Sequence, residues 1–135
     1  ARGFGSVIGP NPEGSAEFGY YPLKPTEAGK DLLPNHFRVT QAHYHGFSAP
    51  DGATILASTD AFSCQAFAMG ETTYGFQFHP ECSWQNFQRW QNKCQSLYAL
   101  AGSQTREEQD LLAGEAHSAQ AKWLEHFLNQ LVGPA

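Results

Sequence analysis

Charged residues are scarce in this sequence, and they form no basic run. Asp, Glu, Lys and Arg make up 16% of the 135 residues, and the formal net charge at pH 7 is -5. Proteins that bind nucleic acids usually present clustered lysine and arginine side chains, which this sequence lacks. We therefore expect no nucleic-acid partner.

Long apolar runs and nucleotide-binding motifs are also missing. No stretch approaches the roughly 20 apolar residues that span a bilayer. Residues 1–14 lack the charged-then-apolar layout of a signal peptide. Neither a G-x-G-x-x-G motif nor a P-loop occurs. We expect no membrane association, no cofactor and a cytoplasmic location.

Cysteine is sparse as well. Cys64, Cys82 and Cys94 are an odd number without metal-ligand spacing. This pattern is more typical of a protein in a reducing compartment than of one held together by disulfide bonds. We expect these residues to be buried thiols.

Aromatic residues, in contrast, are abundant at 13%. The large apolar area that they bring must be covered by the chain's own core, by further sequence or by a partner. A chain of this length matches the commonest size of one domain. We expect residues 1–135 to belong to a single domain.

The most informative stretch is residues 74–81, Tyr-Gly-Phe-Gln-Phe-His-Pro-Glu. Aromatic residues alternate with Gly, Gln and His, and this period of two predicts a strand that has one aromatic face and ends at His79. Pro80 keeps the residue before it extended. Glu81, two residues after His79, should then project to the same side.

A carboxylate beside an imidazole can accept the Nδ1 proton and fix the tautomer. Nε2 is then free to take a proton from a nucleophile. His79 and Glu81 therefore have the residue types of the base half of a catalytic triad. The spacing alone leaves open that they only cap the end of a sheet.

A second pair of histidines raises the alternative of a metal site. If residues 37–45 are extended, His43 and His45 share one face. With His79 and Glu81 they could complete a set of three histidines and one carboxylate. Paired histidines at a strand end are more often hydrogen-bonded loop residues, and no second carboxylate follows at short spacing. We expect no metal.

The remaining patterns predict a hairpin-rich middle followed by two helices. Residues 63–68 should pair with residues 73–79 through a turn at 69–72. One helix should cover residues 83–101. Thr105-x-x-Glu108 is a capping box that starts a second, long helix ending at Gly133-Pro134. The other expected elements are a short strand and a turn within residues 1–14, strands at 15–24 and 54–57, a helical turn at 27–33 and a turn at 50–52.

The second helix is expected to be amphipathic. Its two histidines, His117 and His126, should lie in solvent. Its apolar face should consist of Leu112, Ala116, Ala119, Trp123, Phe127 and Leu131.

Several segments carry a resemblance when they are taken in order. They are "GPNPEG", "EFGYYPL", "HGFSAPDGATILAS", "QAFAMG", "YGFQFHPE" with its following helix, and the tail that begins "QTREEQDLL". In this order they resemble the C-terminal half of a class I glutamine amidotransferase domain. The resemblance implies an α/β, flavodoxin-like three-layer fold, of which this chain would be a C-terminal fragment.

The resemblance also implies residue roles. The family uses a Cys-His-Glu triad, whose last two members match His79 and Glu81. His43 matches a histidine on a strand that flanks the glutamine pocket, where the main chain helps to hold substrate. Tyr44 departs from the small residue usually found at that place.

The family's nucleophilic cysteine lies in a G-x-C-x-G elbow, and no such motif occurs between Ala1 and Ala135. The family's layout would place Ala1 on the helix that leaves this elbow, so we expect the cysteine to lie upstream of this fragment. Cys82 could substitute as nucleophile, but on an extended segment it would point away from His79 and Glu81.

The resemblance implies hydrolysis of the side-chain amide of glutamine, or of another γ-glutamyl compound, through the triad. The ammonia released would pass to a synthase domain or subunit. The missing elbow leaves open an alternative, a non-catalytic scaffold that binds a partner.

Overall fold

The computed structural model describes residues 2–133. Two expectations concern residues outside this range. They are the placement of Ala1 on a helix and the part of Pro134 in ending the last helix. The elements in chain order are η1 (Arg2–Phe4), β1 (Ile8–Pro10), β2 (Glu17–Pro22), β3 (Lys24–Pro25), β4 (Arg38–His43), β5 (His45–Phe47), β6 (Thr54–Ser58), β7 (Ala66–Met69), β8 (Thr73–Phe76), α1 (Trp84–Lys93), η2 (Gln95–Ala99) and α2 (Arg106–Val132).

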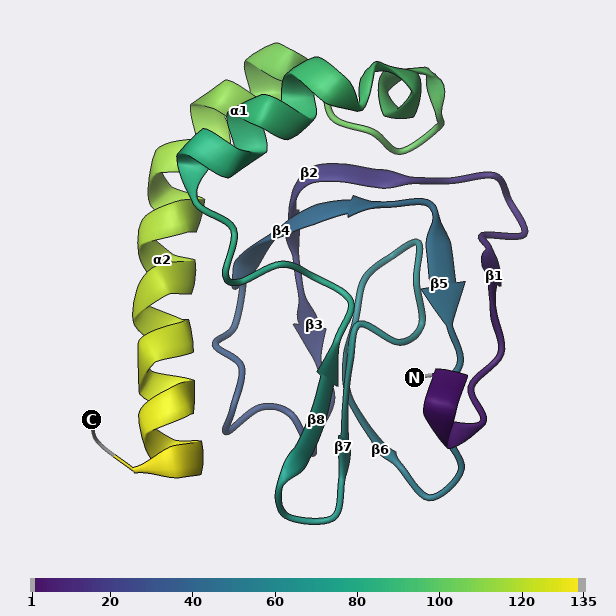
Figure 1. The fold of residues 1–135 in the computed structure, drawn as a ribbon, viewed down its shortest axis with the longest axis vertical. Coiled ribbons are helices and arrows are strands. Elements are labelled where there is room, and N and C mark those ends of the chain that lie inside the picture. Colours follow the sequence, from purple (N-terminus) through teal and green to yellow (C-terminus); the bar gives the residue numbers. More distant parts are fainter. Residues whose placement is uncertain (1, 134–135) are drawn as a thin grey trace.

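Within residues 2–133 the strands form three antiparallel sheets (Figure 1). One pairs β1 with β5 and another pairs β2 with β4. The third has the order β3-β6-β7-β8. The α/β composition, the hairpin-rich middle and the two C-terminal helices were all predicted, and the structure confirms them. The expected turn at residues 50–52 is also present, because the N–H of Ala53 donates to the carbonyl of Pro50.

The β7–β8 hairpin carries the chain towards the predicted site. Met69 pairs with Thr73 across a turn in which Gly70 has a φ of 60°. Within the hairpin, Gly75 of β8 lies opposite Phe67 of β7. The two are so close that a Cβ at Gly75 would lie 2.2 Å from the Phe67 ring. This position requires glycine, because any side chain there would displace a buried ring.

The aromatic face of β8 was predicted correctly, but the end of the strand was not. The rings of Tyr74, Phe76 and Phe78 pack against Trp123 and Phe127 of α2. The strand itself ends at Phe76, three residues before His79. Its antiparallel neighbour β7 begins at Ala66, which pairs with Phe76. Past this pair the two segments share one more backbone hydrogen bond, from the N–H of Gln77 to the carbonyl of Gln65.

The predicted helix over residues 83–101 is two helices. Ser83 caps α1 by accepting a hydrogen bond from the N–H of Asn86. The helix breaks at Cys94, whose φ of -97° and ψ of 41° are not helical. Beside the break the side-chain amide of Gln95 donates to the carbonyl of Gln91 at 2.5 Å. A side chain that competes for a helix carbonyl in this way favours the end of the helix.

The long helix α2 starts at the predicted capping box, in which Thr105 and Glu108 bond to each other's backbone N–H groups. Its buried face differs in part from the prediction, because Ala119 and Leu131 are exposed and Leu112 is half-buried. The buried residues are Gln109, Ala113, Ala116, Gln120, Trp123 and Phe127.

The two buried glutamines of α2 explain this difference, since they satisfy polar groups of the strands beneath. The side chain of Gln120 accepts from the N–H of Thr40 at 2.8 Å and donates to its hydroxyl at 2.9 Å. The side chain of Gln109 donates to the carbonyl of Phe18 at 2.9 Å. A buried polar group is tolerated when it is hydrogen-bonded. Hydrophobic periodicity cannot reveal such positions.

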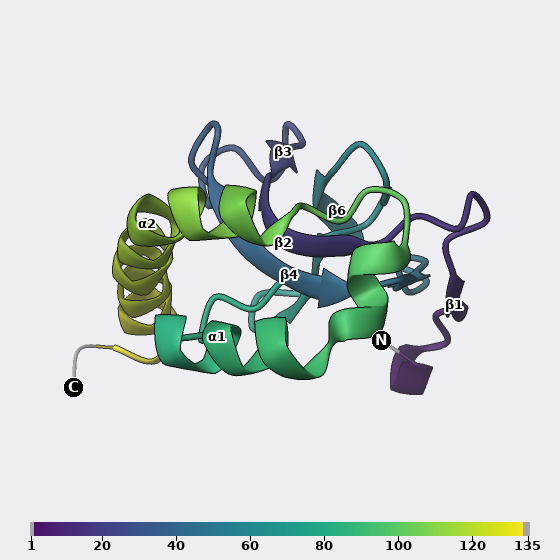
Figure 2. The same cartoon turned by 90° about the horizontal axis from the view of Figure 1, so that it is seen from above.

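The helices cover the β2–β4 sheet, with α1 and the first turns of α2 lying over it (Figure 2). Phe18, Tyr20 and Phe87 form the centre of the core beneath them. The later turns of α2 pack Trp123 and Phe127 against the four-stranded sheet, which makes a second core. Among residues 2–133, no helix combines the length and the apolar character that crossing a bilayer requires.

Candidate functional site

The predicted pair of His79 and Glu81 is formed. Nδ1 of His79 lies 2.9 Å from Oε1 of Glu81, and the side chains are 37% and 64% exposed. The two residues lie on a turn between β8 and α1, in which the N–H of Cys82 donates to the carbonyl of His79 at 3.1 Å. The turn brings the carboxylate to the imidazole, whereas the sequence predicted that an extended His-Pro-Glu segment would do so.

The pair assigns the tautomer of His79. A carboxylate only accepts hydrogen bonds, so Nδ1 must carry the proton. In the neutral ring Nε2 then keeps its lone pair and can take a proton from an approaching group. Trp90 of α1 packs edge-on against the ring, with 5.0 Å between ring centroids. Part of the imidazole remains open to solvent, so a substrate can reach it.

The backbone of the turn is tied to the elements around it. The N–H of His79 donates to the carbonyl of Thr40 in β4 at 2.8 Å. The carbonyl of Cys82 lies 2.9 Å from Nδ1 of His117 in α2. The expectation that His117 lies in solvent was wrong, because the ring is half-buried and its Nε2 lies 2.7 Å from the hydroxyl of Tyr20. Burial lowers the pKa of His117.

His43 lies at the end of β4, and its side chain is only 9% exposed. Nε2 lies 3.0 Å from Oε1 of Gln41 and 3.2 Å from Oε2 of Glu17. Nδ1 lies 2.9 Å from the carbonyl of His45. Every one of these partners is an oxygen acceptor. The side chain is thus engaged in a polar network inside the protein.

That network is continuous and well satisfied. The side-chain amide of Gln41 donates to Oε1 of Gln65 at 2.8 Å. The amide of Gln65 donates in turn to Oε2 of Glu17 at 2.6 Å and to the Thr59 hydroxyl at 3.0 Å. Glu17 is almost fully buried, so its carboxylate depends on these partners.

The structure does not bring His43 and His45 together as a metal site. The extended segment is interrupted at Tyr44, between β4 and β5. His45 is exposed and packs against the ring of Tyr44, whereas His43 points into the polar network. In residues 2–133 no group of three or more His, Cys, Asp and Glu side chains is arranged to hold a metal ion. The metal alternative therefore gains no support.

Cys82 is poorly suited to act as the nucleophile. It is buried beside Phe18, Tyr20 and Phe87. Burial, assisted by the charge of Glu81, raises the pKa of its thiol to about 11. Because the thiolate is the reactive form, a thiol with this pKa is nearly inert at neutral pH. Cys64 is likewise a free, buried thiol, and Cys94 is half-buried.

A cavity of about 580 Å³ lies between the His-Pro-Glu turn and α2. One side is formed by the turn, including Pro80 and Glu81, and the other by α2, including His117, Leu124 and Leu128. The space next to the predicted dyad is therefore hollow and partly apolar.

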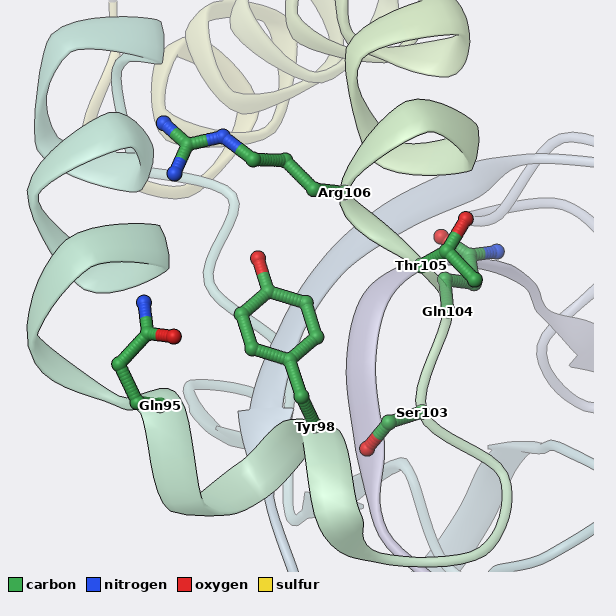
Figure 3. Close-up of a pocket in the computed structure, with 6 residues that line it drawn as sticks. All are labelled: Gln95, Tyr98, Ser103, Gln104, Thr105 and Arg106. Carbon is green, nitrogen blue, oxygen red and sulfur yellow. The ribbon is translucent and has the colours of Figure 1, made fainter.

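A second cavity, of about 320 Å³, lies at the start of α2 (Figure 3). Its lining consists of Gln95, Tyr98, Ser103, Gln104, Thr105 and Arg106, none of which belongs to the predicted site. Two of its polar groups are occupied within the protein. The Tyr98 hydroxyl donates to Gln109 at 2.8 Å, and Nη1 of Arg106 donates to Asn92 at 3.0 Å.

Sequence reasoning missed several groups around the dyad and in the polar network of His43. Glu17 lies in a strand pattern that gives no sign of its burial. Thr40 contributes a backbone carbonyl, which no sequence motif announces. The edge-on contact of Trp90 with the His79 ring was not expected from the sequence. His117 gave no signal in the sequence, because the buried position three residues after it on the same face of α2 is the polar residue Gln120.

Comparison with known proteins places these findings in a family context. The sequence matches no protein-family model. It is 38% identical over 73 residues to the GMP synthase [glutamine-hydrolyzing] of Streptomyces avermitilis, a match that covers 50% of this chain and 14% of that protein. It is 37% identical over 82 residues to the glutamine amidotransferase-like protein YfeJ of Salmonella typhimurium, covering 57% of this chain and 34% of that protein.

Solved structures extend the likeness to nearly the whole chain. A glutamine amidotransferase from Methylobacillus flagellatus superposes with a TM-score of 0.86 at 20% identity, covering 98% of this chain and 57% of that one. A glutamine amidotransferase from Thermotoga maritima gives a TM-score of 0.78 at 19% identity, with the same coverage. The chain thus spans little more than half of these structures and a smaller share of the curated relatives that it matches. The predicted class I glutamine amidotransferase fold is confirmed.

Proposed function

We propose that this chain supplies the histidine and glutamate of a class I glutamine amidotransferase active site. The observation that carries the proposal is the 2.9 Å contact between Nδ1 of His79 and Oε1 of Glu81, in a chain with the fold of that class. The nucleophilic cysteine would come from sequence upstream of Ala1, because no G-x-C-x-G motif occurs in the 135 residues.

The reaction would begin with the cysteine thiolate. Nε2 of His79 takes the proton of the thiol to form this thiolate, which attacks the side-chain amide carbon of glutamine. The carbon–nitrogen bond then breaks as Nε2 donates that proton to the leaving nitrogen. Ammonia departs and a γ-glutamyl thioester remains. His79 then removes a proton from water, the resulting hydroxide attacks the thioester, and glutamate and the cysteine are released.

Each residue of the dyad has a separate role in this scheme. His79 moves the protons, for which its partly exposed ring is accessible to both cysteine and substrate. Glu81 holds the Nδ1 proton, which keeps Nε2 available, and its negative charge stabilises the imidazolium that forms during the reaction. The main chain at His43 would shape one wall of the substrate pocket.

The fate of the ammonia is proposed from the relatives. One of them is a glutamine-hydrolysing GMP synthase, whose name joins glutamine hydrolysis to a synthase. We infer that this chain likewise delivers ammonia to a synthase domain or subunit. Its free thiols suit the reducing conditions of the cytoplasm, where we expect the reaction to occur.

Ammonia and glutamate release from glutamine test the proposal. The protein should be prepared with any upstream sequence that its gene encodes, and in parallel as residues 1–135. We expect equimolar ammonia and glutamate from the first preparation and none from the second. Activity in residues 1–135 that Cys82→Ser abolishes would instead make Cys82 the nucleophile. No activity in either preparation would favour a non-catalytic scaffold, for which the missing elbow is the one supporting observation.

A further inference from the structure

We propose that His117 of α2 is a positioning residue, which holds the His-Pro-Glu turn in the shape that brings Glu81 to His79. This inference rests on the proposed function for its catalytic meaning, although the structural role that it assigns can be tested separately. His117 lies 38 residues after His79 in the sequence, within the tail that begins "QTREEQDLL", and the resemblance assigns it no role.

The dyad needs such support because both of its side chains are partly exposed to water. The Glu81 side chain is 64% exposed and that of His79 is 37% exposed. An exposed ion pair is worth at most about 1 kcal/mol, because solvent screens it and two side chains must be ordered to form it. The attraction between the side chains is therefore too weak to fix their geometry. The backbone that carries them must do so.

His117 bonds directly to that backbone. Its Nδ1 lies 2.9 Å from the carbonyl oxygen of Cys82, the residue that follows Glu81. A carbonyl only accepts, so Nδ1 is the protonated nitrogen of His117. Nε2 consequently accepts the hydrogen bond from the Tyr20 hydroxyl, at 2.7 Å. Both ring nitrogens are satisfied in one neutral tautomer.

The ring of His117 is also held in place by packing. It meets Tyr20 edge-on, with 5.3 Å between centroids, and lies 5.9 Å from Trp84 and 6.4 Å from Phe87. Since Tyr20 is fully buried in β2, the hydrogen bond from its hydroxyl links the turn to the core of the protein. The His117 ring, which donates the hydrogen bond to the Cys82 carbonyl, is therefore held rigidly.

Helix α2 also holds the beginning of the turn, at His79, through Thr40 of β4. Gln120 lies three residues after His117, on the same face of α2, and its side chain bonds to both the N–H and the hydroxyl of Thr40. The carbonyl of Thr40 accepts from the N–H of His79. One face of α2 therefore holds His79 through Thr40 and holds Cys82 directly, with Glu81 between the two attachment points.

Substitutions of His117 can separate positioning from general stability. Asparagine places an amide N–H near the position of Nδ1, so His117→Asn should preserve the bond to the Cys82 carbonyl. Glutamine places its amide nearer the position of Nε2, so His117→Gln should lose that bond, as should His117→Ala. His126→Ala is the matched control, because His126 is exposed on the same helix.

The first measurement is amide hydrogen exchange in the protein with any upstream sequence that its gene encodes. The Cys82 N–H, which closes the turn, should exchange at least tenfold faster in His117→Ala and His117→Gln. In His117→Asn and His126→Ala it should exchange as in wild type. Unchanged exchange at Cys82 in both His117→Gln and His117→Ala would overturn the proposal. If His117→Ala fails to fold, the comparison of the Asn and Gln variants at equal melting temperature decides.

The second measurement is glutamine hydrolysis by the same variants. Misplacement of a catalytic group by about 1 Å can cost on the order of 100-fold in rate, so kcat should fall by about 10- to 100-fold in His117→Gln while KM changes little. His117→Asn should keep kcat within about threefold of wild type. Equal kcat in the Asn and Gln variants would contradict the positioning role. If wild type releases no ammonia while exchange at Cys82 still separates the variants, the proposed function fails and the structural role of His117 stands.

Discussion

Nδ1 of His79 lies 2.9 Å from Oε1 of Glu81, two positions later in the chain, although the two side chains are 37% and 64% exposed. Pro80 stands between them, and the turn is closed by the hydrogen bond from the N–H of Cys82 to the carbonyl of His79. The contact is therefore a property of the backbone, which the attachments to β4 and α2 hold in place.

Replacing the carboxylate alone should damage catalysis only in part. Glu81→Gln keeps an oxygen acceptor for the Nδ1 proton of His79 but removes the charge that stabilises the imidazolium. We expect kcat for glutamine to fall by about tenfold, which is less than the loss of a complete general base. Steady-state kinetics measure this. Glu71→Gln, an exposed carboxylate in the β7–β8 turn, is the control. A Glu81→Gln variant with wild-type kcat would mean that the pair does not act in the reaction.

His43→Ala should act mainly on substrate binding. The His43 side chain faces the internal network and not solvent, so its loss removes no proton-transfer group. It should loosen the end of β4, where the pocket wall is proposed, and raise KM for glutamine more than it lowers kcat. Initial rates over a range of glutamine concentrations separate the two effects. A variant that loses kcat entirely at unchanged KM would show that His43 takes part in the chemistry.

The buried carboxylate of Glu17 should be important for stability. In Glu17→Ala the amide of Gln65 loses its acceptor at 2.6 Å and His43 loses its anionic partner at 3.2 Å. Leaving a buried hydrogen-bond donor without its acceptor typically costs about 1–3 kcal/mol in free energy of unfolding. Urea denaturation measures the loss. Glu17→Gln, which keeps the shape and one acceptor oxygen, should lose less. Equal losses in the two variants would argue that the charge, which both remove, and not the retained shape and acceptor oxygen, decides the stability at this position.

The pH dependence of the free energy of unfolding should show the lowered pKa of His117. Burial lowers its pKa in the folded protein below the ordinary value of 6.5. In the interval between these two values the unfolded chain binds more protons than the folded one, so the free energy of unfolding rises with pH there. The contribution of His117 is complete above about pH 6.5 and is lost as the pH falls through the lowered pKa.

The groups that face His117 are the Tyr20 hydroxyl and the Cys82 carbonyl, and Glu81 and Glu125 line the same cavity. Asparagine at this position does not titrate. Urea denaturation between pH 5 and 8 should therefore show wild type losing stability relative to His117→Asn as the pH falls. Parallel curves for the two proteins would contradict this assignment.

Much of the fold follows from local patterns in the sequence. The alternation of aromatic and polar residues predicted the hairpin and the core face of β8, and Thr105 with Glu108 predicted the start of α2. Local patterns failed where long-range contacts decided the outcome. Strand β8 ends early because its neighbour β7 does not continue, and the helix after Ser83 breaks where a side chain competes for a carbonyl.

The same division holds at the candidate site. The pairing of His79 with Glu81 was predicted from the local spacing and from Pro80. The roles of Thr40 and His117 were not predictable, because each depends on a contact between residues more than 30 positions apart. The extended segment that would have aligned His43 with His45 was predicted without the interruption at Tyr44.

The most direct test is the turnover of glutamine by His79→Ala, in the protein that includes any upstream sequence its gene encodes. His126→Ala, which changes an exposed histidine of α2, serves as the control. A positioned histidine that acts as general acid and base is typically worth about 10²–10⁴-fold in rate. We expect kcat to fall by at least about 100-fold in His79→Ala, with the melting temperature unchanged and the control at wild-type activity. A His79→Ala variant that keeps kcat within a few-fold of wild type would contradict the assignment of the base to this turn.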